Sequence, residues 1–345
     1  MNQKRDDHKL RLAIPSKGAL ERSTSELLAA AGLKVSRPND RQYVGTISSL
    51  PDVEVIFQRA ADIFTKVQEG SVDLEITGYD IYAEESAGYN HVVDIYPELG
   101  FGRCELVLAV PDSWIDIVSM ADLADLTLDF RENKGRNLRI VTKYPNLTRA
   151  WLKKHQIVHF SLVEANGALE AAPKMGYADM IADVSSTGTT LRENRLKPIT
   201  GDPMLKSQAC IIANKRLLQN DRRKQEVTKL ILDSIEAQLE AKKFTSITAN
   251  IQGDSADELG KRLLHNMELA ALAGMRGPTI AKVYSATEPN WYAVTIVVHQ
   301  AQWREAVNHL RQARGTDITV FAPNYIFGAE SRHSKQLAAV LEHKK

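Results

Sequence analysis

Short apolar runs alternate with stretches of helical spacing through the first two thirds of the chain. Leu20, Leu27 and Leu28 recur at helical intervals, which predicts a helix over 19–31 that stops at Gly32. The apolar runs are short and bounded by turn residues, as is typical of strands. This alternation favours α/β layers over a helical bundle or a β-sandwich. The predicted strands lie at residues 12–15, 53–57, 72–76, 105–110, 138–141, 181–184 and 208–213, with further helices at 61–68, 147–155 and 168–175.

The predicted strands fall into two blocks. The second block begins after Gly100 and Gly102, and the apolar run at 208–213 is expected to return to the first block. Such a return makes two lobes joined by paired connections, with a ligand cleft between them. We therefore assign residues 9–102 and 207–222 to lobe I and residues 103–206 to lobe II.

The pattern changes after a long polar helix, which is predicted over 215–243 and assigned as a connector from residue 223 onward. The elements beyond it follow a β-α-β-β-α-β order, which is the ferredoxin-like plan. We predict this domain over 244–327 and a largely polar tail over 328–345. Its predicted strands are 244–251, 279–284, 291–298 and 317–321, and its helices are 256–271 and 302–313.

Composition narrows the classes of protein without identifying one. The 345 residues carry 44 basic and 43 acidic side chains, so no general electrostatic attraction to nucleic acid or to a membrane is expected. No run approaches the roughly 18 apolar residues of a membrane span, and Met1–Lys9 is too polar for the core of a signal peptide. We therefore expect a cytoplasmic protein. Cys104 and Cys210 lie in apolar runs, which predicts buried, reduced thiols.

The stretch Ala178–Leu191 carries the strongest candidate chemistry. It is typical of a strand containing Asp179 and Asp183 that ends in a hydroxyl-rich turn and then a helix. Because side chains alternate along a strand, both carboxylates are expected on one face, where they meet ribose hydroxyls or Mg²⁺. Hydroxyls and N–H groups at a helix start favour an anion, and a glycine lets the backbone approach it. The turn residues are Ser186, Thr187, Gly188, Thr189 and Thr190, for which an ordinary Ser/Thr helix cap is the alternative interpretation.

Five further motifs come before this stretch in the sequence. They are Arg11–Gly18, Arg59–Ile63, Asp73–Asp80, Arg139–Leu147 and Asn166–Glu170. Taken together, the motifs show that the chain resembles the ATP phosphoribosyltransferase family over roughly residues 9 to 327. Members of that family catalyse the first step of histidine biosynthesis. The resemblance implies a two-lobed α/β core like that of periplasmic binding proteins, followed by a ferredoxin-like regulatory domain. It also implies a reaction that joins N1 of the ATP adenine to C1 of phosphoribosyl pyrophosphate and releases pyrophosphate, with Mg²⁺ on the leaving group.

The resemblance assigns roles to single residues. Asp179 and Asp183 are expected at the ribose hydroxyls, either of them within reach of Mg²⁺, and the turn at 186–190 at the 5′-phosphate. A metal site made of protein ligands alone is not expected. Because the nucleophile belongs to the substrate, the enzyme has to align two substrates and stabilise developing charge. Nucleotide or pyrophosphate contacts are assigned to Lys17, Gly18, Arg59, Gly78, Lys143, Tyr144 and Gly167, for which solvated side chains and simple turn glycines are the alternatives.

The C-terminal domain is expected, from the same resemblance, to bind free histidine as a feedback inhibitor. The run Gly277–Thr279 matches the place where the family's domain motif begins. Thr279 and Asn250 are the candidate histidine contacts. The resemblance further implies a homo-oligomer, in which dimers assemble into a hexamer when the enzyme is inhibited.

Two positions depart from the family pattern. Ala19 stands where an Arg is common after Lys-Gly, which removes one expected phosphate or nucleotide contact. Glu75 stands where a small residue is common, and its charge is expected either at the lip of the pocket or within it.

Two other classes of protein share parts of this pattern. A solute-binding module would bind a small anion without chemistry, and a salvage phosphoribosyltransferase would also place acids before a Thr-Gly turn. The absence of a signal peptide and the appended domain disfavour the first class, whereas the motifs at 142–146 and 166–170 disfavour the second. Pyrophosphate release that requires both ATP and phosphoribosyl pyrophosphate distinguishes the three.

Overall fold

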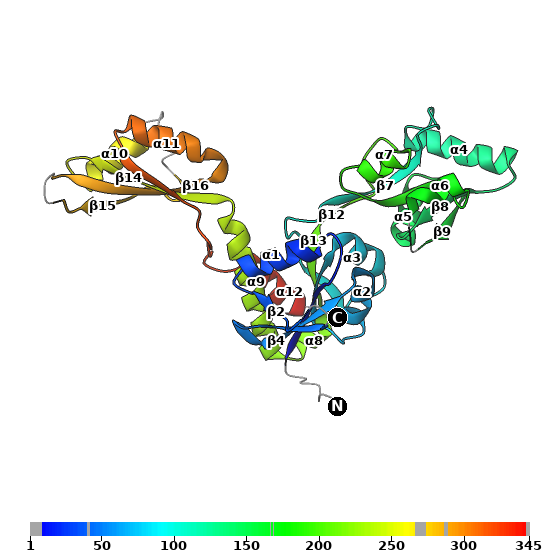
Figure 1. Cartoon of the computed structure of the whole chain (residues 1–345), viewed down its shortest axis with the longest axis horizontal. Coiled ribbons are helices and arrows are strands. Elements are labelled where there is room, and N and C mark those ends of the chain that lie inside the picture. Colours follow the sequence, from blue (N-terminus) through cyan, green and yellow to red (C-terminus); the bar gives the residue numbers. More distant parts are fainter. Residues whose placement is uncertain are drawn as a thin grey trace. The chain divides into compact units, whose positions relative to one another are not determined.

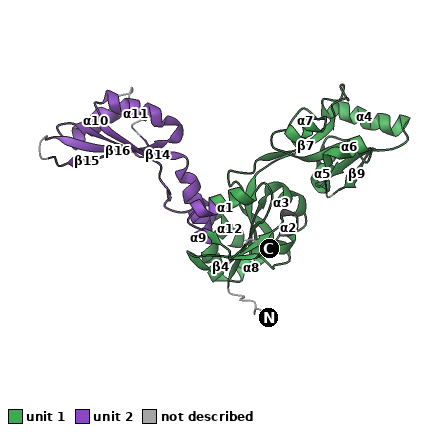
Figure 2. Cartoon of the chain, in the orientation of Figure 1, with its two compact units in different colours: residues 1–26, 35–228, 336–345 green, residues 27–34, 229–335 purple. Residues whose placement is uncertain are grey.

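The computed structural model describes residues 9–39, 42–165, 167, 169–265, 274–285 and 289–342. The chain forms two compact units (Figure 2). Within the described part, no helix is both long enough and apolar enough to cross a membrane. Unit 1 comprises residues 1–26, 35–228 and 336–345, and unit 2 comprises residues 27–34 and 229–335.

Lobe I is built on a seven-stranded sheet in the order β2-β3-β4-β1-β5-β13-β6. In this sheet β1 (Leu10–Pro15) lies parallel to both β4 (Leu50–Gln58) and β5 (Leu74–Gly78). Every residue of β5 is buried, which is the pattern of a strand covered on both faces. The other elements before lobe II are β2 (Val35–Ser36), β3 (Val44–Ile47), β6 (Val92–Tyr96), α1 (Glu21–Ala30), α2 (Ala60–Gln68) and α3 (Tyr79–Glu85) (Figure 1).

The strand β13 (Ala209–Asn214) confirms the predicted return of the chain to the first sheet. It lies between β5 and β6 and runs antiparallel to both. All of its residues are buried, in keeping with its apolar sequence. The expected two-lobed core is therefore present, with lobe II inserted between β6 and β13.

Lobe II contains a six-stranded mixed sheet in which β11, β7, β10, β8 and β9 follow one another and β12 also pairs with β7. Its helix α4 begins at a capping box between Ser119 and Asp122, and α5 has Pro145 in its first turn, where the missing N–H costs nothing. The strands are β7 (Cys104–Pro111), β8 (Leu138–Thr142), β9 (Phe160–Glu164), β10 (Met180–Ser185), β11 (Leu196–Pro198) and β12 (Leu205–Ser207). The helices are α4 (Met120–Asn133), α5 (Pro145–Lys154), η1 (Leu169–Ala171), α6 (Ala172–Met175) and α7 (Thr189–Glu193).

The segment predicted as one long connector helix forms two helices in the structure. The first, α8 (Lys215–Gln219), is capped by the Asn214 side chain, which accepts a hydrogen bond from the Leu217 N–H at 3.2 Å. The second, α9 (Arg222–Ala241), runs from unit 1 into unit 2. The description of this segment as a polar connector is incomplete, because one side of α9 is buried at Val227, Ile231, Leu232 and Ile235.

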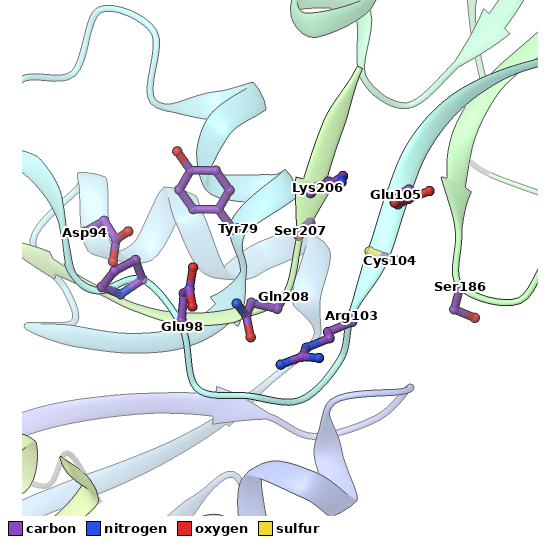
Figure 3. Close-up of a pocket in the computed structure, with 11 residues that line it drawn as sticks. Tyr79, Asp94, Glu98, Arg103, Cys104, Glu105, Ser186, Lys206, Ser207 and Gln208 are labelled. Carbon is purple, nitrogen blue, oxygen red and sulfur yellow. The ribbon is translucent and has the colours of Figure 1, made fainter. Parts of the chain in front are cut away.

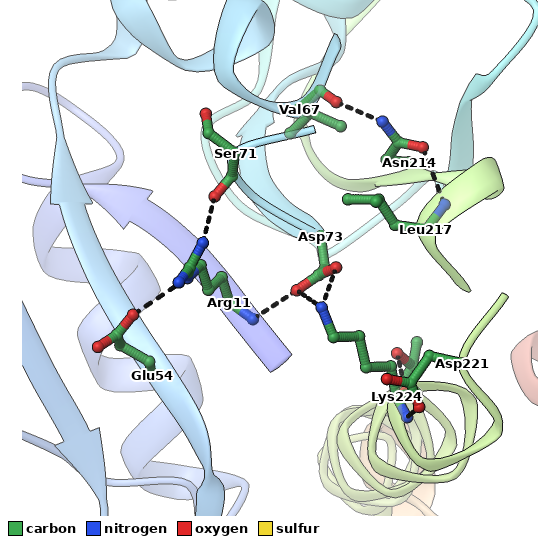
Figure 4. Close-up of polar contacts among 10 residues, drawn as sticks. Arg11, Glu54, Val67, Ser71, Asp73, Asn214, Leu217, Asp221 and Lys224 are labelled. Atoms are coloured by element: carbon green, nitrogen blue, oxygen red, sulfur yellow. Dashed lines mark hydrogen bonds and ion pairs between the residues drawn. The ribbon is translucent and has the colours of Figure 1, made fainter. Parts of the chain in front are cut away.

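A buried ion pair attaches the start of α9 to the sheet of lobe I (Figure 4). Lys224 Nζ lies 2.9 and 3.1 Å from the two carboxylate oxygens of Asp73, which is only 1% exposed. The same carboxylate accepts the Arg11 N–H at 2.8 Å, and Arg11 Nε in turn donates to Glu54 at 3.2 Å. The charges of this network are therefore paired within the fold rather than held out toward a ligand.

The C-terminal domain has the predicted ferredoxin-like plan. Its antiparallel sheet has the order β15-β16-β14-β17, and its two helices lie on one face of that sheet (Figure 1). The predicted helix end at 266–271 lies outside the described residues. The elements are β14 (Phe244–Gln252), α10 (Ala256–His265), β15 (Thr279–Val283), β16 (Trp291–His299), η3 (Gln300–Gln302), α11 (Trp303–Gln312) and β17 (Thr316–Phe321).

The segment predicted as a tail contains a helix, α12 (Arg332–Glu342). Its start is held by Glu236, whose carboxylate accepts hydrogen bonds from Ser331 Oγ at 2.6 Å and from His333 Nδ1 at 3.0 Å. Leu337 is fully buried. The short apolar patch seen in the sequence is therefore the buried side of a helix.

Candidate functional site

The predicted phosphate turn forms an exposed loop at the carboxyl end of β10. Gly188 has a left-handed backbone (φ +70°), in which a β-branched residue is strained, and its N–H donates to Ser185 Oγ at 3.1 Å. The hydroxyl of Thr187 donates to Thr189 Oγ1 at 3.0 Å, and Arg192 Nη2 donates to the same oxygen at 3.2 Å. The loop thus contains all five predicted residues, Ser186, Thr187, Gly188, Thr189 and Thr190. Helix α7 adds the guanidinium of Arg192, which the sequence pattern did not single out.

Asp183 lies on β10, three residues before Ser186, and is half-buried. Burial raises the pKa of its carboxyl, while the positive charge of Lys143 opposes this shift. Its Oδ1 accepts the Val184 N–H at 2.8 Å, and no salt bridge engages it within the described residues. Asp183 therefore keeps carboxylate acceptor positions free beside the loop.

Asp179 lies at the opposite end of β10 from the loop, so the structure does not bring the two predicted ribose-binding carboxylates together beside it. It precedes β10, four residues and about 13 Å along an extended chain from Asp183. Its two oxygens are held by Arg136, at 2.6 and 2.8 Å, and by Arg139, at 3.1 and 3.2 Å. These bonds hold the pKa of Asp179 well below its usual range despite partial burial. Asp179 therefore ties the start of β10 to the start of β8, its neighbour in the lobe II sheet.

Tyr144 joins the two lobes instead of facing an open pocket. Its hydroxyl donates to Asp80 Oδ2 at 2.6 Å, and Ser207 Oγ donates to Asp80 Oδ1 at 2.7 Å. Tyr144 is 8% exposed and Asp80 is 7% exposed, and burial together with the Asp80 charge raises the pKa of the phenol. The proton of this hydroxyl is therefore engaged by Asp80, and Tyr144 could donate it to a nucleotide only by breaking that bond.

Gly78 makes room for the Asp80 carboxylate at this junction between the two lobes. A Cβ at this position would collide with the Asp80 carboxylate, because Gly78 directly precedes α3 and the carboxylate folds back over it. The reason for this glycine is therefore an internal close approach, and no ligand approach to it is needed to explain it.

Two other predicted residues lie on lobe II. Lys143 is exposed at the carboxyl end of β8, directly after Thr142. Gly167 is exposed, but its neighbours at 166 and 168 lie outside the described residues.

Lys17 and Arg59 line one cavity of about 580 Å³ on lobe I. They follow β1 and β4, which are parallel neighbours paired from Leu10–Val53 to Pro15–Gln58, so both loops leave the same edge of the sheet. Gly18 has φ +88° and provides the left-handed turn after Lys17. This β1/β4 cavity is lined by Ser16, Lys17, Tyr43, Ile56, Phe57, Gln58, Arg59, Thr65 and Lys66.

A second cavity, of about 600 Å³, lies where the chain passes between lobe I and the strands β7 and β12 of lobe II (Figure 3). It brings Arg103 and Lys206 to the same space as Ser186 of the phosphate loop. Cys104 lines it and is only half-buried, in contrast to the predicted buried thiol, and burial raises its pKa to about 11. Neither cation was identified from the sequence, because each is a single basic residue outside the motifs singled out there. Its lining residues are Tyr79, Asp94, Pro97, Glu98, Arg103, Cys104, Glu105, Ser186, Lys206, Ser207 and Gln208.

Glu75 contradicts the expectation of a charge at or in the pocket. It is fully buried, opposite Ala13 of β1 and Ile212 of β13, in the apolar core of lobe I. Neither carboxylate oxygen has a hydrogen-bond partner among the described residues. Burial raises the pKa of this carboxyl to about 8. The other family departure, Ala19, is exposed.

The two candidate histidine contacts lie on one face of the C-terminal sheet but on strands that do not touch. Thr279 of β15 pairs with Thr295 of β16, and Thr295 pairs with Thr248 of β14. Asn250 is two residues further along β14, and its amide donates to Asp317 at 3.1 Å. The separation across two strand spacings and two residues is about 12 Å. One histidine would therefore have to span the width of β16 to contact both side chains, and a pocket that uses both stays a prediction.

Comparisons with known proteins identify the family. The family described as ATP phosphoribosyltransferase matches residues 59–237, and that described as HisG, C-terminal domain, matches residues 241–324. ATP phosphoribosyltransferase 2, chloroplastic, of Arabidopsis thaliana is 38% identical over 338 residues, which cover 96% of this chain and 80% of the relative. The ATP phosphoribosyltransferase of Rhodopseudomonas palustris is 34% identical over 331 residues, which cover 96% of this chain and 98% of the relative.

Among solved structures, the ATP phosphoribosyl transferase (HisG:HisZ) complex from Thermotoga maritima contains a chain with 25% sequence identity and a TM-score of 0.48. That similarity covers 66% of this chain and 98% of the other. The assignment of the chain to a family rests on the two family matches and on the two relatives named above. The chain belongs to the ATP phosphoribosyltransferase family, in the form with the C-terminal domain.

Proposed function

We propose that the chain catalyses attack of N1 of the ATP adenine on C1 of phosphoribosyl pyrophosphate, the first step of histidine biosynthesis. The observation that carries this proposal is the exposed hydroxyl-rich loop at 186–190, which begins three residues after Asp183, whose carboxylate has no salt bridge within the described residues. A bond forms between N1 and C1, and the bond between C1 and the pyrophosphate oxygen breaks. The pyrophosphate leaves with the electron pair of the broken bond.

The chain's own residues position the phosphoribosyl group and stabilise its charge. The N–H groups and hydroxyls of the loop, with Arg192, bind the 5′-phosphate. Asp183 accepts hydrogen bonds from the ribose hydroxyls and places a negative charge where the ring becomes cationic. Arg103 and Lys206, which share a cavity with Ser186, supply positive charge for the departing pyrophosphate. None of these residues acts as a nucleophile.

Mg²⁺ fits this site as a partner of the substrate phosphates. No cluster of three or more His, Cys, Asp or Glu side chains among the described residues could hold a metal ion. Mg²⁺ is commonly bound by one or two carboxylates together with substrate phosphates, and Asp183 is the carboxylate available here. When bound, the ion would neutralise charge on the pyrophosphate.

Pyrophosphate release tests the reaction. We expect release only when ATP and phosphoribosyl pyrophosphate are both present with Mg²⁺. Release with a free purine or pyrimidine base in place of ATP would instead indicate a salvage enzyme. Binding of either substrate without any pyrophosphate release would indicate a binding module.

We further propose that the C-terminal domain makes the enzyme sensitive to free histidine and that the chain works as a homo-oligomer. The support is the match of residues 241–324 to the family's C-terminal domain. Feedback requires histidine to bind one state of the enzyme more tightly than another. With both substrates near half-saturation, we expect millimolar histidine to lower the rate, and an unchanged rate would refute this part of the proposal.

A simple truncation after Lys243 is a poor test of that regulation. Gln219 Nε2 donates to the Leu341 carbonyl at 2.7 Å, and residues 336–345 belong to unit 1. Removing everything after residue 243 would therefore also remove part of unit 1. The substitution Thr279→Val, assayed with and without histidine, leaves unit 1 intact.

A further inference from the structure

Helix α5 of lobe II begins without a cap from its own flanking residue. Tyr144, which precedes the first turn, offers no side-chain acceptor to the helix, and Pro145 has no N–H. Glu84, on α3 of lobe I, takes the two N–H groups that follow. Its Oε1 accepts the Asn146 N–H at 2.7 Å, and its Oε2 accepts the Leu147 N–H at 2.9 Å. A carboxylate of one lobe thus caps a helix of the other, at the end where the helix dipole favours negative charge.

Glu84 is buried and shares this contact with a second carboxylate. It is only 3% exposed, and the Asn146 side-chain amide donates to its backbone carbonyl at 3.2 Å. Asp80 lies one turn earlier on α3, and therefore on the same face of that helix. The Asp80 carboxylate accepts the Tyr144 hydroxyl at 2.6 Å. Two carboxylates of lobe I thus hold the start of α5 and the residue before it.

Lys143 is the residue whose position depends on this attachment. It lies between Tyr144 and Thr142, the last residue of β8. Thr142 pairs with Ala182 of the parallel strand β10, so the next residues along the two strands, Lys143 and Asp183, are neighbours. The positive charge of Lys143 acts on the Asp183 carboxyl. Lys143 is exposed, so its ammonium is accessible to a ligand beside Asp183.

The proposed reaction leaves one anionic group for this ammonium. Asp183 faces the ribose hydroxyls, and the loop at 186–190 binds the 5′-phosphate. The other anionic group of that substrate is the pyrophosphate at C1, next to the 2′-hydroxyl. A lysine is a mobile point charge that suits a phosphate chain, and its side chain loses entropy when it binds. A fixed backbone at Lys143 therefore favours the contact.

We propose that Glu84 is a positioning residue for this reaction: by capping α5 from lobe I, it holds Lys143 beside Asp183, where the ammonium binds the pyrophosphate of phosphoribosyl pyrophosphate. Glu84 itself touches no substrate. The inference rests on the proposed function, since it names how one substrate group of that reaction is held. Lobe II then does not define the pyrophosphate site alone, because a helix of lobe I fixes the turn that carries Lys143.

A double-mutant cycle tests this role through equilibrium binding of phosphoribosyl pyrophosphate to the full chain without ATP. We expect Glu84→Gln to weaken binding by about tenfold, because an amide oxygen can accept only one of the two N–H groups and its NH₂ faces the other. Lys143→Met should weaken binding by at least about tenfold. In the Lys143→Met background, Glu84→Gln should cost less than about a further twofold, because the two residues act as one unit.

Two controls separate positioning from a general loss of structure. Glu85→Gln removes the neighbouring exposed carboxylate of α3 and should leave the affinity unchanged. Ribose 5-phosphate lacks the pyrophosphate, so its affinity should be the same in Glu84→Gln, in Lys143→Met and in the wild type.

Amide hydrogen exchange reports on the cap itself. Exchange at Asn146 and Leu147 should be faster in Glu84→Gln than in the wild type, because both N–H groups lose their carboxylate acceptor. Equally slow exchange would overturn the inference. Circular dichroism checks the fold of each variant. If Glu84→Gln does not fold, Tyr144→Phe, which loosens the same turn at Asp80, takes its place in the cycle.

Failure of this inference is distinguishable from failure of the proposed function. Losses that multiply in the double variant would overturn it, because Glu84 would then act independently of Lys143. An unchanged affinity in folded Glu84→Gln would also overturn it, as would an equal loss for ribose 5-phosphate, even if pyrophosphate release requires both substrates. Losses that do not multiply, without any pyrophosphate release, would support the positioning role and contradict the proposed reaction.

Discussion

The hydroxyl of Tyr144 and the carboxylate of Asp80 form a 2.6 Å hydrogen bond between residues 64 positions apart in the chain. Tyr144 precedes α5 of lobe II, and Asp80 lies in the first turn of α3 of lobe I. A second contact reinforces the same junction, because Glu84 accepts the N–H groups of Asn146 and Leu147 at 2.7 and 2.9 Å. The two lobes of unit 1 are thus joined by contacts between the start of α5 and both ends of α3, as well as through their connecting strands.

Removing the Tyr144 hydroxyl should therefore loosen this junction. We expect Tyr144→Phe to lower the free energy of unfolding by about 1.5–3 kcal/mol, the usual worth of a hydrogen bond to a charged group. Urea denaturation measures the change. The matched variant Tyr177→Phe removes an exposed hydroxyl and should leave stability unchanged. Equal stability of both variants would show that the Asp80 contact contributes nothing.

Asp179→Asn should reduce stability rather than substrate binding. The carboxylate holds Arg136 and Arg139 through charge-assisted hydrogen bonds, and an amide can replace only part of them. We expect a loss of about 1–3 kcal/mol in the free energy of unfolding, with the affinity for phosphoribosyl pyrophosphate unchanged. Denaturation and substrate titration of the same preparation measure both. A loss of affinity without a loss of stability would restore the ribose-binding role predicted from the sequence.

Asp183→Asn should show the opposite behaviour. This carboxylate has no cation partner within the described residues, so its removal costs the fold little. Its proposed role is to favour the cationic sugar, an effect of a few kcal/mol in transition-state stabilisation, so the turnover rate should fall by at least about a hundredfold. Steady-state rates together with circular dichroism test this. An unchanged rate in a folded variant would remove Asp183 from the proposed site.

Gly188→Val should weaken phosphoribosyl pyrophosphate much more than ATP. The left-handed backbone at φ +70° is strained for a β-branched residue, and relief of that strain would displace the loop. We expect at least about a tenfold loss in affinity for phosphoribosyl pyrophosphate and a much smaller one for ATP. Gly176→Val places the same strain at φ +77° after α6, away from the loop. Equal losses for both substrates, or the same effect from Gly176→Val, would count against the phosphate loop.

Local patterns in the sequence predicted the elements better than they predicted the partners of charged side chains. Alternation and helical spacing depend on neighbours in the chain, and they located the return strand β13 and the ferredoxin-like domain. The partners of Asp179 are 40 and 43 residues away, so nothing beside it in the sequence shows that two arginines hold it. Lys17 and Arg59 were assigned from the family motifs, and they line one cavity because the parallel strands β1 and β4 end at the same edge of the sheet.

Glu75 offers the clearest dependence of stability on pH. Burial raises its pKa from the ordinary 4.5 to about 8, so the folded chain holds a proton that the unfolded chain releases at lower pH. Since the native state binds more protons than the unfolded state over that interval, the free energy of unfolding should fall as the pH rises from about 4.5 to 8 and then level off.

Glu75→Gln removes this dependence because an amide does not ionise. We expect the variant to be more stable than the wild type above pH 8 by on the order of a few kcal/mol, and the advantage should shrink steadily toward pH 5. Urea denaturation at several pH values measures both curves. Glu69→Gln, on the exposed surface after α2, is the matched control and should leave the slope in place. Parallel curves for wild type and Glu75→Gln would mean that Glu75 ionises in the folded protein as easily as in water, against its complete burial between β1 and β13.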